Sequence, residues 1–188
     1  MTIIDDINVL ITTSGIGSRL GNFTKYSNKC LVKVGDIPVI TRILNSYPQE
    51  TNFYITLGHN GDLVKQYLNI AHPNLKFTFI LVDKYEGPES SLAYSLLKAK
   101  PFLQKPFIYH ACDTIVESYV PDLSKNWIGG YKKMNSTHYA TINVEGDRVI
   151  KINPKGELNY DYEYIGISSI ADYKIFWEKL ENIYLFGS

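Results

Sequence analysis

A glycine-rich stretch near the N-terminus is followed by two basic side chains. Residues 12–20 are Thr-Thr-Ser-Gly-Ile-Gly-Ser-Arg-Leu, and Lys29 follows Arg19 by ten residues. Glycines after a strand let backbone N–H groups approach an anion without obstruction by a Cβ atom. Arginine binds phosphate through its planar guanidinium, and lysine supplies a compact positive charge. The segment therefore predicts a polyphosphate site, in which negative charge is held and a leaving group is stabilised.

One aspartate stands where a metal ligand is expected. Asp113 follows a predicted buried strand over 107–111, and open α/β sheets bind ligands at the carboxyl ends of their strands. Magnesium uses few protein carboxylates and completes its shell with water and phosphate oxygens. One well-placed aspartate is therefore enough to begin a site for such a cation, and a helix-capping role for Asp113 is the alternative. His110 and Cys112 share one strand face, but no second pair of soft ligands supports a zinc site.

The N-terminal pattern resembles the signature of sugar-1-phosphate nucleotidyltransferases and their cytidylyltransferase relatives. In that family a glycine-rich loop leads to Arg-Leu, and a lysine follows about ten residues later. Residues 29–40 (Lys-Cys-Leu-Val-Lys-Val-Gly-Asp-Ile-Pro-Val-Ile) resemble the family's lysine, short apolar piece and Gly-Asp-x-Pro turn. The resemblance extends over about residues 6–180 and is strongest over 8–44 and 107–114.

Three departures from the family pattern leave the nucleotide preference open. Thr12, Thr13 and Ser14 replace small apolar residues before the first glycine. Gly21 stands where a proline often follows Arg-Leu, and Asn28 stands where a proline often precedes the lysine. None of these changes removes a charge or a required glycine.

The resemblance implies a role for each matching residue. Arg19 would neutralise the departing pyrophosphate, and Lys29 would hold the α-phosphate or the incoming ester. Asp113 corresponds to the family's metal-binding aspartate, although Cys112 stands where glycine is usual. Glu163 and Gly166 would lie on the acceptor side. The nucleotide-binding residues would be Thr13, Ser14, Gly15, Gly17, Ser18, Gly58, Glu86 and Gly87.

The implied reaction is nucleotidyl transfer. A phosphate oxygen of a sugar-1-phosphate, phosphocholine or related ester would attack the α-phosphorus of an NTP in line and release pyrophosphate with Mg²⁺. Such transfer depends on positioning and on charge stabilisation by cations. We expect the product to serve as a precursor for cell-surface polysaccharide. The sequence identifies neither the base nor the acceptor.

Three other functions remain open at this point. A GT-A glycosyltransferase would share the nucleotide-binding architecture, but it normally has two aspartates that bracket one residue. A short-chain reductase is suggested by Ser14 to Gly17 and by the Tyr-x-x-x-Lys spacing of Tyr94 and Lys98, although that pair falls early in the chain. A non-catalytic nucleotide-binding or assembly module would release no pyrophosphate.

Apolar strands alternate with amphipathic helices in the first part of the chain. The alternation predicts a mostly parallel central sheet with helices on both faces, and the resemblance makes this a Rossmann-like, GT-A-type α/β fold. A hairpin over 139–152, a strand over 162–170 and a helix over 172–180 would form a small acceptor region. Expected strands are 7–13, 30–34, 52–57, 76–82 and 107–111, and expected helices begin near Pro38, Asp62 and Ser90.

The composition indicates a single globular domain over 1–188, and the resemblance implies a nucleotide-binding half (1–115) and an acceptor-binding half (116–188) within it. Of 188 residues, 45% are hydrophobic, and 19 basic residues balance 19 acidic ones, so no nucleic acid or anionic membrane partner is expected. No apolar run approaches the roughly 20 residues that span a bilayer. Two isolated cysteines and no signal peptide predict a cytoplasmic protein.

The resemblance also implies a second metal-binding aspartate, and the sequence offers none that is convincing. Neither Asp161 nor Asp172 matches the position of that aspartate in the family pattern. We therefore expect the chain to be a fragment of a larger protein, in which a small-molecule kinase domain is fused or associated. The oligomeric state is not predicted.

Overall fold

The computed structural model describes residues 7–117, 122–132 and 137–187. The helices are the 3₁₀ turns η1 (Ser18–Thr24) and η2 (Lys29–Leu31), and α1 (Val39–Asn45), α2 (Gly61–Ala71), α3 (Leu92–Ala99) and α4 (Tyr173–Phe186). The strands are β1 (Asn8–Thr12), β2 (Lys33–Val34), β3 (Ile37–Pro38), β4 (Asn52–Leu57), β5 (Lys76–Leu81), β6 (Phe107–Ala111), β7 (Trp127–Lys132), β8 (Thr141–Glu145), β9 (Arg148–Asn153) and β10 (Tyr162–Ile170).

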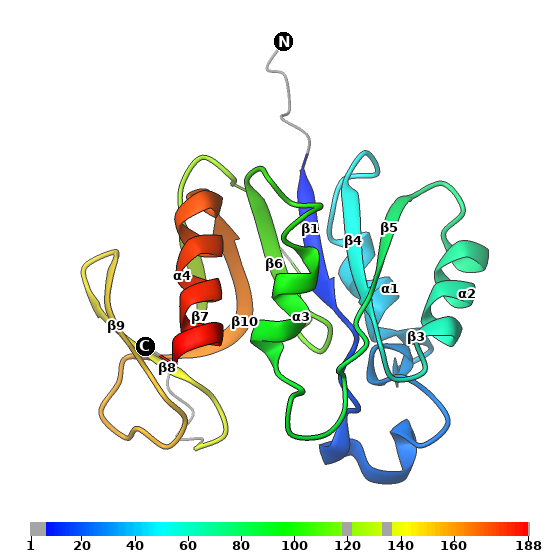
Figure 1. The fold of residues 1–188 in the computed structure, drawn as a ribbon, viewed down its shortest axis with the longest axis horizontal. Helices are drawn as coiled ribbons and strands as arrows, with labels where there is room; N and C mark the ends of the chain where they lie inside the picture. Colours follow the sequence, from blue (N-terminus) through cyan, green and yellow to red (C-terminus); the bar gives the residue numbers. More distant parts are fainter. Residues whose placement is uncertain (1–6, 118–121, 133–136, 188) are drawn as a thin grey trace.

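One mixed sheet organises the molecule (Figure 1). Its eight strands follow the order β5-β4-β1-β6-β10-β8-β9, and β7 also pairs with β10. The strands β5, β4, β1 and β6 are parallel, whereas β10 runs antiparallel to β6. The short strands β2 and β3 form a separate hairpin. Helices surround a mostly parallel core, so the expected α/β fold is confirmed.

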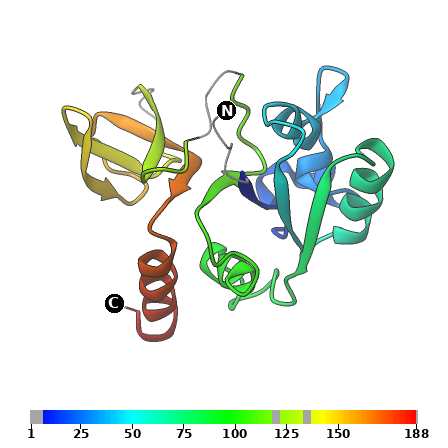
Figure 2. The same cartoon turned by 90° about the horizontal axis from the view of Figure 1, so that it is seen from above.

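Side chains of the central strand β1 pack against helices on both faces of the sheet. Val9 and Ile11 belong to the core cluster that includes residues of α1 and α2, and Leu10 belongs to the cluster with residues of α3 and α4. Figure 2 shows α3 and α4 together on one side of the sheet. All three side chains are fully buried. Burial on both faces explains why this strand is a continuous apolar run rather than an alternating one.

The antiparallel half of the sheet is built on the long strand β10. Its pairing with β7 shifts register between Tyr164 and Ser168. Gly166 lies within that irregularity at φ +84°, a conformation that L side chains rarely adopt. The expected hairpin is present as β8 and β9, joined at Gly146, which has φ +58°.

Some boundaries differ from the sequence predictions. The strand β7 was not predicted, because Gly129 and Gly130 interrupt its apolar pattern. Residues 29–31 form the turn η2 rather than the start of an extended piece. Ser91, not Ser90, caps α3, since its hydroxyl accepts a hydrogen bond from the Tyr94 backbone N–H at 3.0 Å. The last helix continues to residue 186.

Two leucines in the first turns of α2 and α3 are exposed. Leu63 is 42% exposed and Leu92 is 51% exposed. The buried residues are Gly61, Val64 and Leu68 on α2 and Ser95, Leu96 and Ala99 on α3. Each helix therefore buries one face against the sheet and leaves part of its apolar surface at the N-terminal end in contact with solvent.

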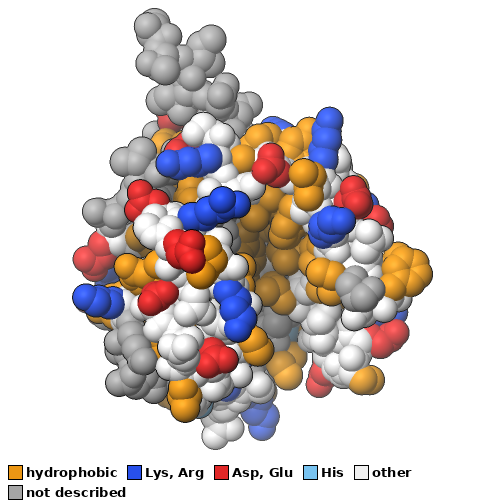
Figure 3. All heavy atoms as spheres, turned by 90° about the vertical axis from the view of Figure 1, so that its left-hand side faces the viewer, with side chains coloured by type: hydrophobic (Ala, Val, Ile, Leu, Met, Phe, Trp, Pro, Cys, Tyr) orange, Lys and Arg blue, Asp and Glu red, His pale blue; other side chains and the backbone are white. Residues whose placement is uncertain are grey.

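The side of the molecule that carries α4 and the antiparallel strands is hollowed. Figure 3 views this side and shows hydrophobic side chains lining the hollow. Apolar residues of α4 remain exposed, among them Ile175 (58%) and Ile183 (56%). Within the three described ranges, no helix combines the length and apolar character needed to cross a bilayer.

Candidate active site

The carboxyl ends of β1 and β6 lie side by side at one edge of the sheet. The two strands are parallel neighbours, and Thr12 at the end of β1 pairs with Ala111 at the end of β6. From β1 the chain builds outward through β4 and β5, then returns to the other side of β1 to form β6. The order of strands therefore reverses between β1 and β6. Open α/β sheets bind ligands at such a switch point.

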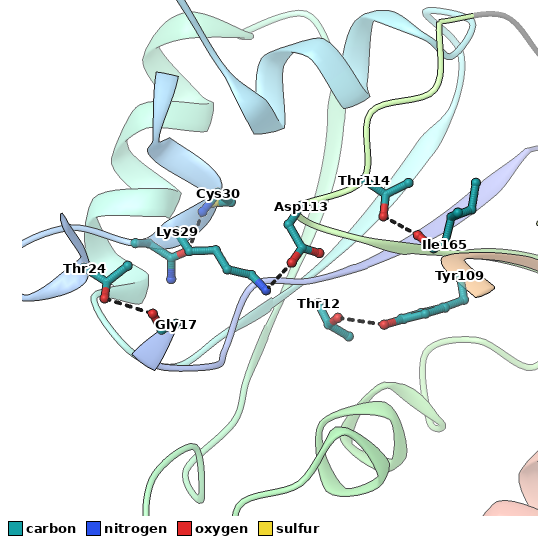
Figure 4. A network of polar contacts seen from close by, with 10 residues as sticks. Thr12, Gly17, Thr24, Lys29, Cys30, Tyr109, Asp113, Thr114 and Ile165 are labelled. Carbon is teal, nitrogen blue, oxygen red and sulfur yellow. Dashed lines mark hydrogen bonds and ion pairs between the residues drawn. The ribbon is translucent and has the colours of Figure 1, made fainter. Parts of the chain in front are cut away.

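Lys29 and Asp113 meet at this edge. The Lys29 Nζ atom lies 2.9 Å from Asp113 Oδ2 and forms an ion pair with it. In Figure 4 the Lys29 side chain extends from the turn η2 toward the aspartate, which follows β6. The lysine side chain is 26% exposed and the aspartate side chain 53% exposed. Both charged groups are thus reachable from solvent at the expected place.

The surroundings of Lys29 favour its charged form. Burial alone would lower its pKa, but the anionic form of Cys112 and the hydrogen bond and charge of Asp113 outweigh burial and raise the pKa above the ordinary value of 10.5. Burial also raises the pKa of the Cys112 thiol to about 12. That thiol is therefore neutral at physiological pH, where Asp113 is the anion beside the ammonium group, and the Cys112 anion contributes only at the alkaline pH at which Lys29 itself titrates.

Arg19 brings a second positive charge to the same region. It lies on η1 and is exposed. Its guanidinium is near enough to oppose the charge of Lys29 and to lower the pKa of that lysine. The structure thus brings the two predicted cations and the predicted metal ligand to one edge of the sheet, where a polyphosphate would relieve the repulsion between the cations.

The glycine-rich loop leaves β1 beside this cluster. Gly15 is exposed, and a Cβ atom built on it would meet nothing within 4 Å. Gly17 has φ +65°, and a Cβ there would lie 3.1 Å from the Cβ of Lys29. Ser18 is exposed at the start of η1. Gly15 and Ser18 therefore face solvent as an anion-binding loop requires, and Gly17 lets the loop pack against Lys29.

Thr13 and Ser14 point into the protein instead. Thr13 Oγ1 donates to the Thr56 carbonyl at 2.6 Å, and Ser14 Oγ lies 2.9 Å from Ser95 Oγ. Both residues are buried, at 1% and 3% exposure. Their side chains anchor the loop to β4 and α3, so any contact with a nucleotide would be made by their backbone.

Gly58 ends β4 where the chain touches the same loop. A Cβ built on Gly58 would lie 2.5 Å from the Ser14 carbonyl oxygen and 2.8 Å from the Tyr85 Cβ. Contacts under 3.0 Å leave no room for a side chain, so this position requires glycine. Glu86 and Gly87, the other residues predicted on the base side, lie exposed in the loop that continues from Tyr85. Gly87 has φ +82°.

The two residues predicted on the acceptor side have different environments. Gly166 lies close to the metal-side turn, because a Cβ built on it would be 2.7 Å from Ala111 Cβ and 3.2 Å from Thr114 Oγ1. Glu163 is only 3% exposed, and the Tyr160 hydroxyl donates to its Oε1 at 2.8 Å. The expectation that Glu163 faces an acceptor is therefore not supported, since its carboxylate is bound inside the antiparallel half.

Two buried polar residues near the site, Asn28 and His110, hold neighbouring segments together through hydrogen bonds. The sequence alone did not indicate this role. Asn28 is fully buried, and its side-chain amide forms hydrogen bonds with the backbone of Thr13, Cys30 and His59.

His110 is also fully buried, with Nδ1 2.7 Å from the Tyr47 hydroxyl and Nε2 2.9 Å from the Thr114 carbonyl. A carbonyl accepts only, so Nε2 carries the proton and Nδ1 accepts from tyrosine. Burial lowers the pKa of His110 to about 4. For His110, its position inside the apolar strand β6 was the one sequence feature that could have indicated a buried hydrogen-bonding role.

The donor set at Asp113 suits magnesium better than a softer metal. In the described part of the chain, no three His, Cys, Asp or Glu side chains form a metal-binding cluster. A single exposed carboxylate fits an ion that takes most of its ligands from water and phosphate. His110 is engaged at both nitrogens, and Cys112 is buried among core residues. These two residues are therefore packing and hydrogen-bonding groups rather than zinc ligands.

Two further features lie away from this cluster. A cavity of about 360 Å³ opens between the ends of α1 and α2, near the start of β4, and none of the predicted site residues line it. The Tyr94 and Lys98 pair, which suggested a reductase, is engaged elsewhere: both side chains bind Asp83, at 2.8 and 2.7 Å. Neither the cavity nor the Tyr94–Lys98 pair therefore belongs to the site formed around Lys29 and Asp113.

The fold is similar to several solved structures. A UDP-glucose pyrophosphorylase complexed with UDP-glucose matches with a TM-score of 0.78 and 14% identity, over 94% of this chain and 79% of that one. The CTP:phosphocholine cytidylyltransferase from Streptococcus pneumoniae matches with a TM-score of 0.73 and 19% identity, over 97% and 79%. The inositol-1-phosphate CTP transferase from T. maritima matches with a TM-score of 0.72 and 18% identity, over 92% and 73%.

These matches establish that the chain has the fold of these nucleotidyltransferases, in agreement with the resemblance of its N-terminal motif. No protein-family model and no curated protein sequence matches the chain.

Proposed function

We propose that this chain transfers a nucleotidyl group from an NTP to a small phosphate ester, such as a sugar-1-phosphate, and releases pyrophosphate in a magnesium-dependent reaction. The observation that carries the proposal is the 2.9 Å contact between Lys29 and Asp113 at the switch point of the sheet. A fixed cation, a carboxylate for a hard metal ion and an open glycine-rich loop are the groups that phosphoryl chemistry requires.

Lys29 is the group that we assign to the reacting phosphate. Its pKa is raised above 10.5, so it carries a full positive charge at neutral pH. In the reaction, an oxygen of the acceptor phosphate forms a bond to the α-phosphorus, and the bond from that phosphorus to the bridging oxygen of the leaving pyrophosphate breaks. Negative charge accumulates on the α-phosphate oxygens meanwhile. A preorganised ammonium group beside those oxygens stabilises the transition state.

Asp113 is the residue that would hold Mg²⁺. When bound, the ion would neutralise phosphate charge and help to align the α-phosphate with the acceptor. In the structure Asp113 Oδ2 is occupied by Lys29. Asp113 would hold the ion through its carboxylate, and Lys29 would present its ammonium group to the phosphate. Before substrates bind, the ion pair between Lys29 and Asp113 holds both side chains at the site.

The remaining roles follow from position. Arg19 would neutralise the pyrophosphate as it departs, and the backbone of the loop from Thr13 to Ser18 would bind the triphosphate. Residues 1–115 would bind the nucleotide, and residues 116–188 would bind the acceptor beside Gly166.

We further propose that the enzyme acts in the cytoplasm and makes a precursor of a cell-surface polysaccharide. Its free, buried cysteines, Cys30 and Cys112, suit a reducing compartment.

The test is a pyrophosphate-release screen of ATP, CTP, GTP and UTP against sugar-1-phosphates, phosphocholine and inositol-1-phosphate, with and without Mg²⁺. The proposal expects release that needs one NTP, one ester and the metal. NTP binding without release under any combination would instead support the non-catalytic module. Transfer from a nucleoside diphosphate sugar, with no pyrophosphate formed, would support the glycosyltransferase.

A further inference from the structure

The side chain of Asn28 joins three segments of the site through one buried amide. Its Nδ2 donates to the carbonyl oxygens of Thr13 and His59, each at 2.7 Å. Its Oδ1 accepts from the backbone N–H of Cys30 at 3.0 Å. The residue is fully buried. Both amide hydrogens and the amide oxygen are therefore used, and each partner lies in a different part of the site.

The partners fix the orientation of this amide. Exchange of Oδ1 and Nδ2 would place the oxygen against two carbonyl oxygens and the NH₂ group against the N–H of Cys30. A buried amide without matched partners loses its hydrogen bonds and still bears the desolvation cost. Only one orientation of the Asn28 amide therefore satisfies all three contacts.

Neighbouring contacts tie the same segments together. His59 Nε2 lies 2.7 Å from the Thr24 carbonyl, and Asn60 Nδ2 donates to the Ser27 carbonyl at 3.0 Å. The segment from Thr24 to Asn28 is thus held against the turn that follows β4. Asn28 is the last residue of this segment and the cap of η2, the turn that carries Lys29.

We propose that Asn28 is a positioning residue, which fixes Lys29 relative to the glycine-rich loop before substrate binds. It holds Thr13, from which the loop leaves β1, and through Cys30 it holds the turn from which Lys29 extends toward Asp113 (Figure 4). The inference rests on the function proposed for Lys29. A displacement of about 1 Å between catalytic groups costs up to roughly 100-fold in rate, so this bridge would contribute to turnover without touching the substrate.

Activity tests the link to Lys29. Asn28→Asp keeps the shape of the side chain but removes both N–H donors and places a negative charge against the carbonyls of Thr13 and His59. Asn28→Ala removes the amide altogether and serves as the second variant if the charged one does not fold. We expect Asn28→Ala to lower kcat by about 10- to 100-fold, but by less than about threefold in a Lys29→Ala background, because the effect passes through Lys29. Equal losses in the two backgrounds would overturn the positioning role.

Thiol modification tests the bridge without any substrate. Cys30 is fully buried, and burial raises the pKa of its thiol well above 9.0, so it should react slowly with iodoacetamide. In a Cys112→Ala background, Asn28→Ala should speed alkylation of Cys30 at least about tenfold through local opening of η2. A rate equal to that of the parent protein would overturn the inference.

A second buried asparagine, whose amide NH₂ group donates hydrogen bonds but whose Oδ1 has no partner among the residues that the structure describes, provides the control. Asn153 is 2% exposed and donates to Asn143 Oδ1 at 2.7 Å in the antiparallel half. Asn153→Ala should leave Cys30 alkylation within about twofold of the parent, because the two sites share no contacts. Fast alkylation in both variants would indicate general destabilisation and overturn the inference. If the parent protein releases no pyrophosphate, the proposed function fails, while the alkylation rates still decide whether Asn28 fixes the turn.

Discussion

The ammonium of Lys29 lies 2.9 Å from the carboxylate of Asp113, although 84 positions separate the two residues in the chain. The two segments that carry them follow strands that are parallel neighbours, β1 and β6. A cation that grips phosphate and a carboxylate that suits magnesium therefore share one edge of the sheet.

Removal of the ammonium group should abolish most turnover while leaving the fold intact. We expect Lys29→Ala to lower kcat by at least about 100-fold, as for other preorganised electrostatic groups. Lys29 is partly exposed, so the thermal midpoint measured by circular dichroism should change little. Steady-state pyrophosphate release with the NTP and ester found by the screen provides the measurement. Turnover near the parent level would remove Lys29 from the mechanism.

Neutralisation of Asp113 should change the metal requirement. Asp113→Asn keeps the shape but removes the charge that binds a hard cation, so the Mg²⁺ concentration for half-maximal rate should rise by about tenfold or more. A magnesium titration of the rate measures this shift.

The pair of Lys100 and Glu181 provides the matched control for that titration. It has a 2.7 Å contact and side chains 32% and 47% exposed, close to the values of Lys29 and Asp113. Glu181→Gln should leave the magnesium dependence unchanged. An equal shift in both variants would indicate a general electrostatic effect and not a metal site.

Two glycines should respond differently to the same substitution. Gly58→Ala places a Cβ 2.5 Å from the Ser14 carbonyl, so we expect a loss of about 1–3 kcal/mol in unfolding free energy. Gly15→Ala meets nothing within 4 Å and should retain stability, but it should raise the KM for the NTP by obstructing the backbone. Urea unfolding and initial rates separate the two effects. Equal stability losses would show that the loop packs differently from the structure.

His110 should make the protein less stable in mild acid. Its folded pKa is about 4, compared with 6.5 for the free side chain, so the unfolded chain binds an extra proton between these values. Stability should therefore fall as the pH drops from about 6.5 toward 4, by at most about 3 kcal/mol for this group. His110→Gln cannot titrate and should lose that part of the slope. Urea unfolding at pH 7, 5.5 and 4.5 tests this, and an unchanged slope would contradict it.

The core of the site could be predicted because it depends on strand ends. A buried run before the glycine-rich loop and another before Asp113 placed both at the carboxyl edge of one sheet, and the spacing of Arg19 and Lys29 indicated anion binding. The direct contact between Lys29 and Asp113 could not be predicted, because it depends on how far η1 carries the chain before Lys29 returns to the sheet.

The errors have physical reasons. Glu163 was predicted to lie on the acceptor side, yet it is buried on β10, where its carboxylate accepts a hydrogen bond from the Tyr160 hydroxyl. The register of β10 shifts between Tyr164 and Ser168, so a simple alternation along the strand did not reveal which way Glu163 points. The role of Asn28 was invisible for a different reason. Its partners, Thr13 and His59, are 15 and 31 residues away, and only the folded chain brings those carbonyls to one amide.

The most direct test of the central claim is a crystal structure with Mg²⁺ and a non-hydrolysable analogue of the NTP that the screen selects. We expect an α-phosphate oxygen within about 3 Å of Lys29 Nζ, the metal ion on Asp113, and the β- and γ-phosphates over the backbone of Gly15 to Ser18. A nucleotide bound elsewhere, for example in the cavity beside His72, with Lys29 still paired to Asp113, would contradict it.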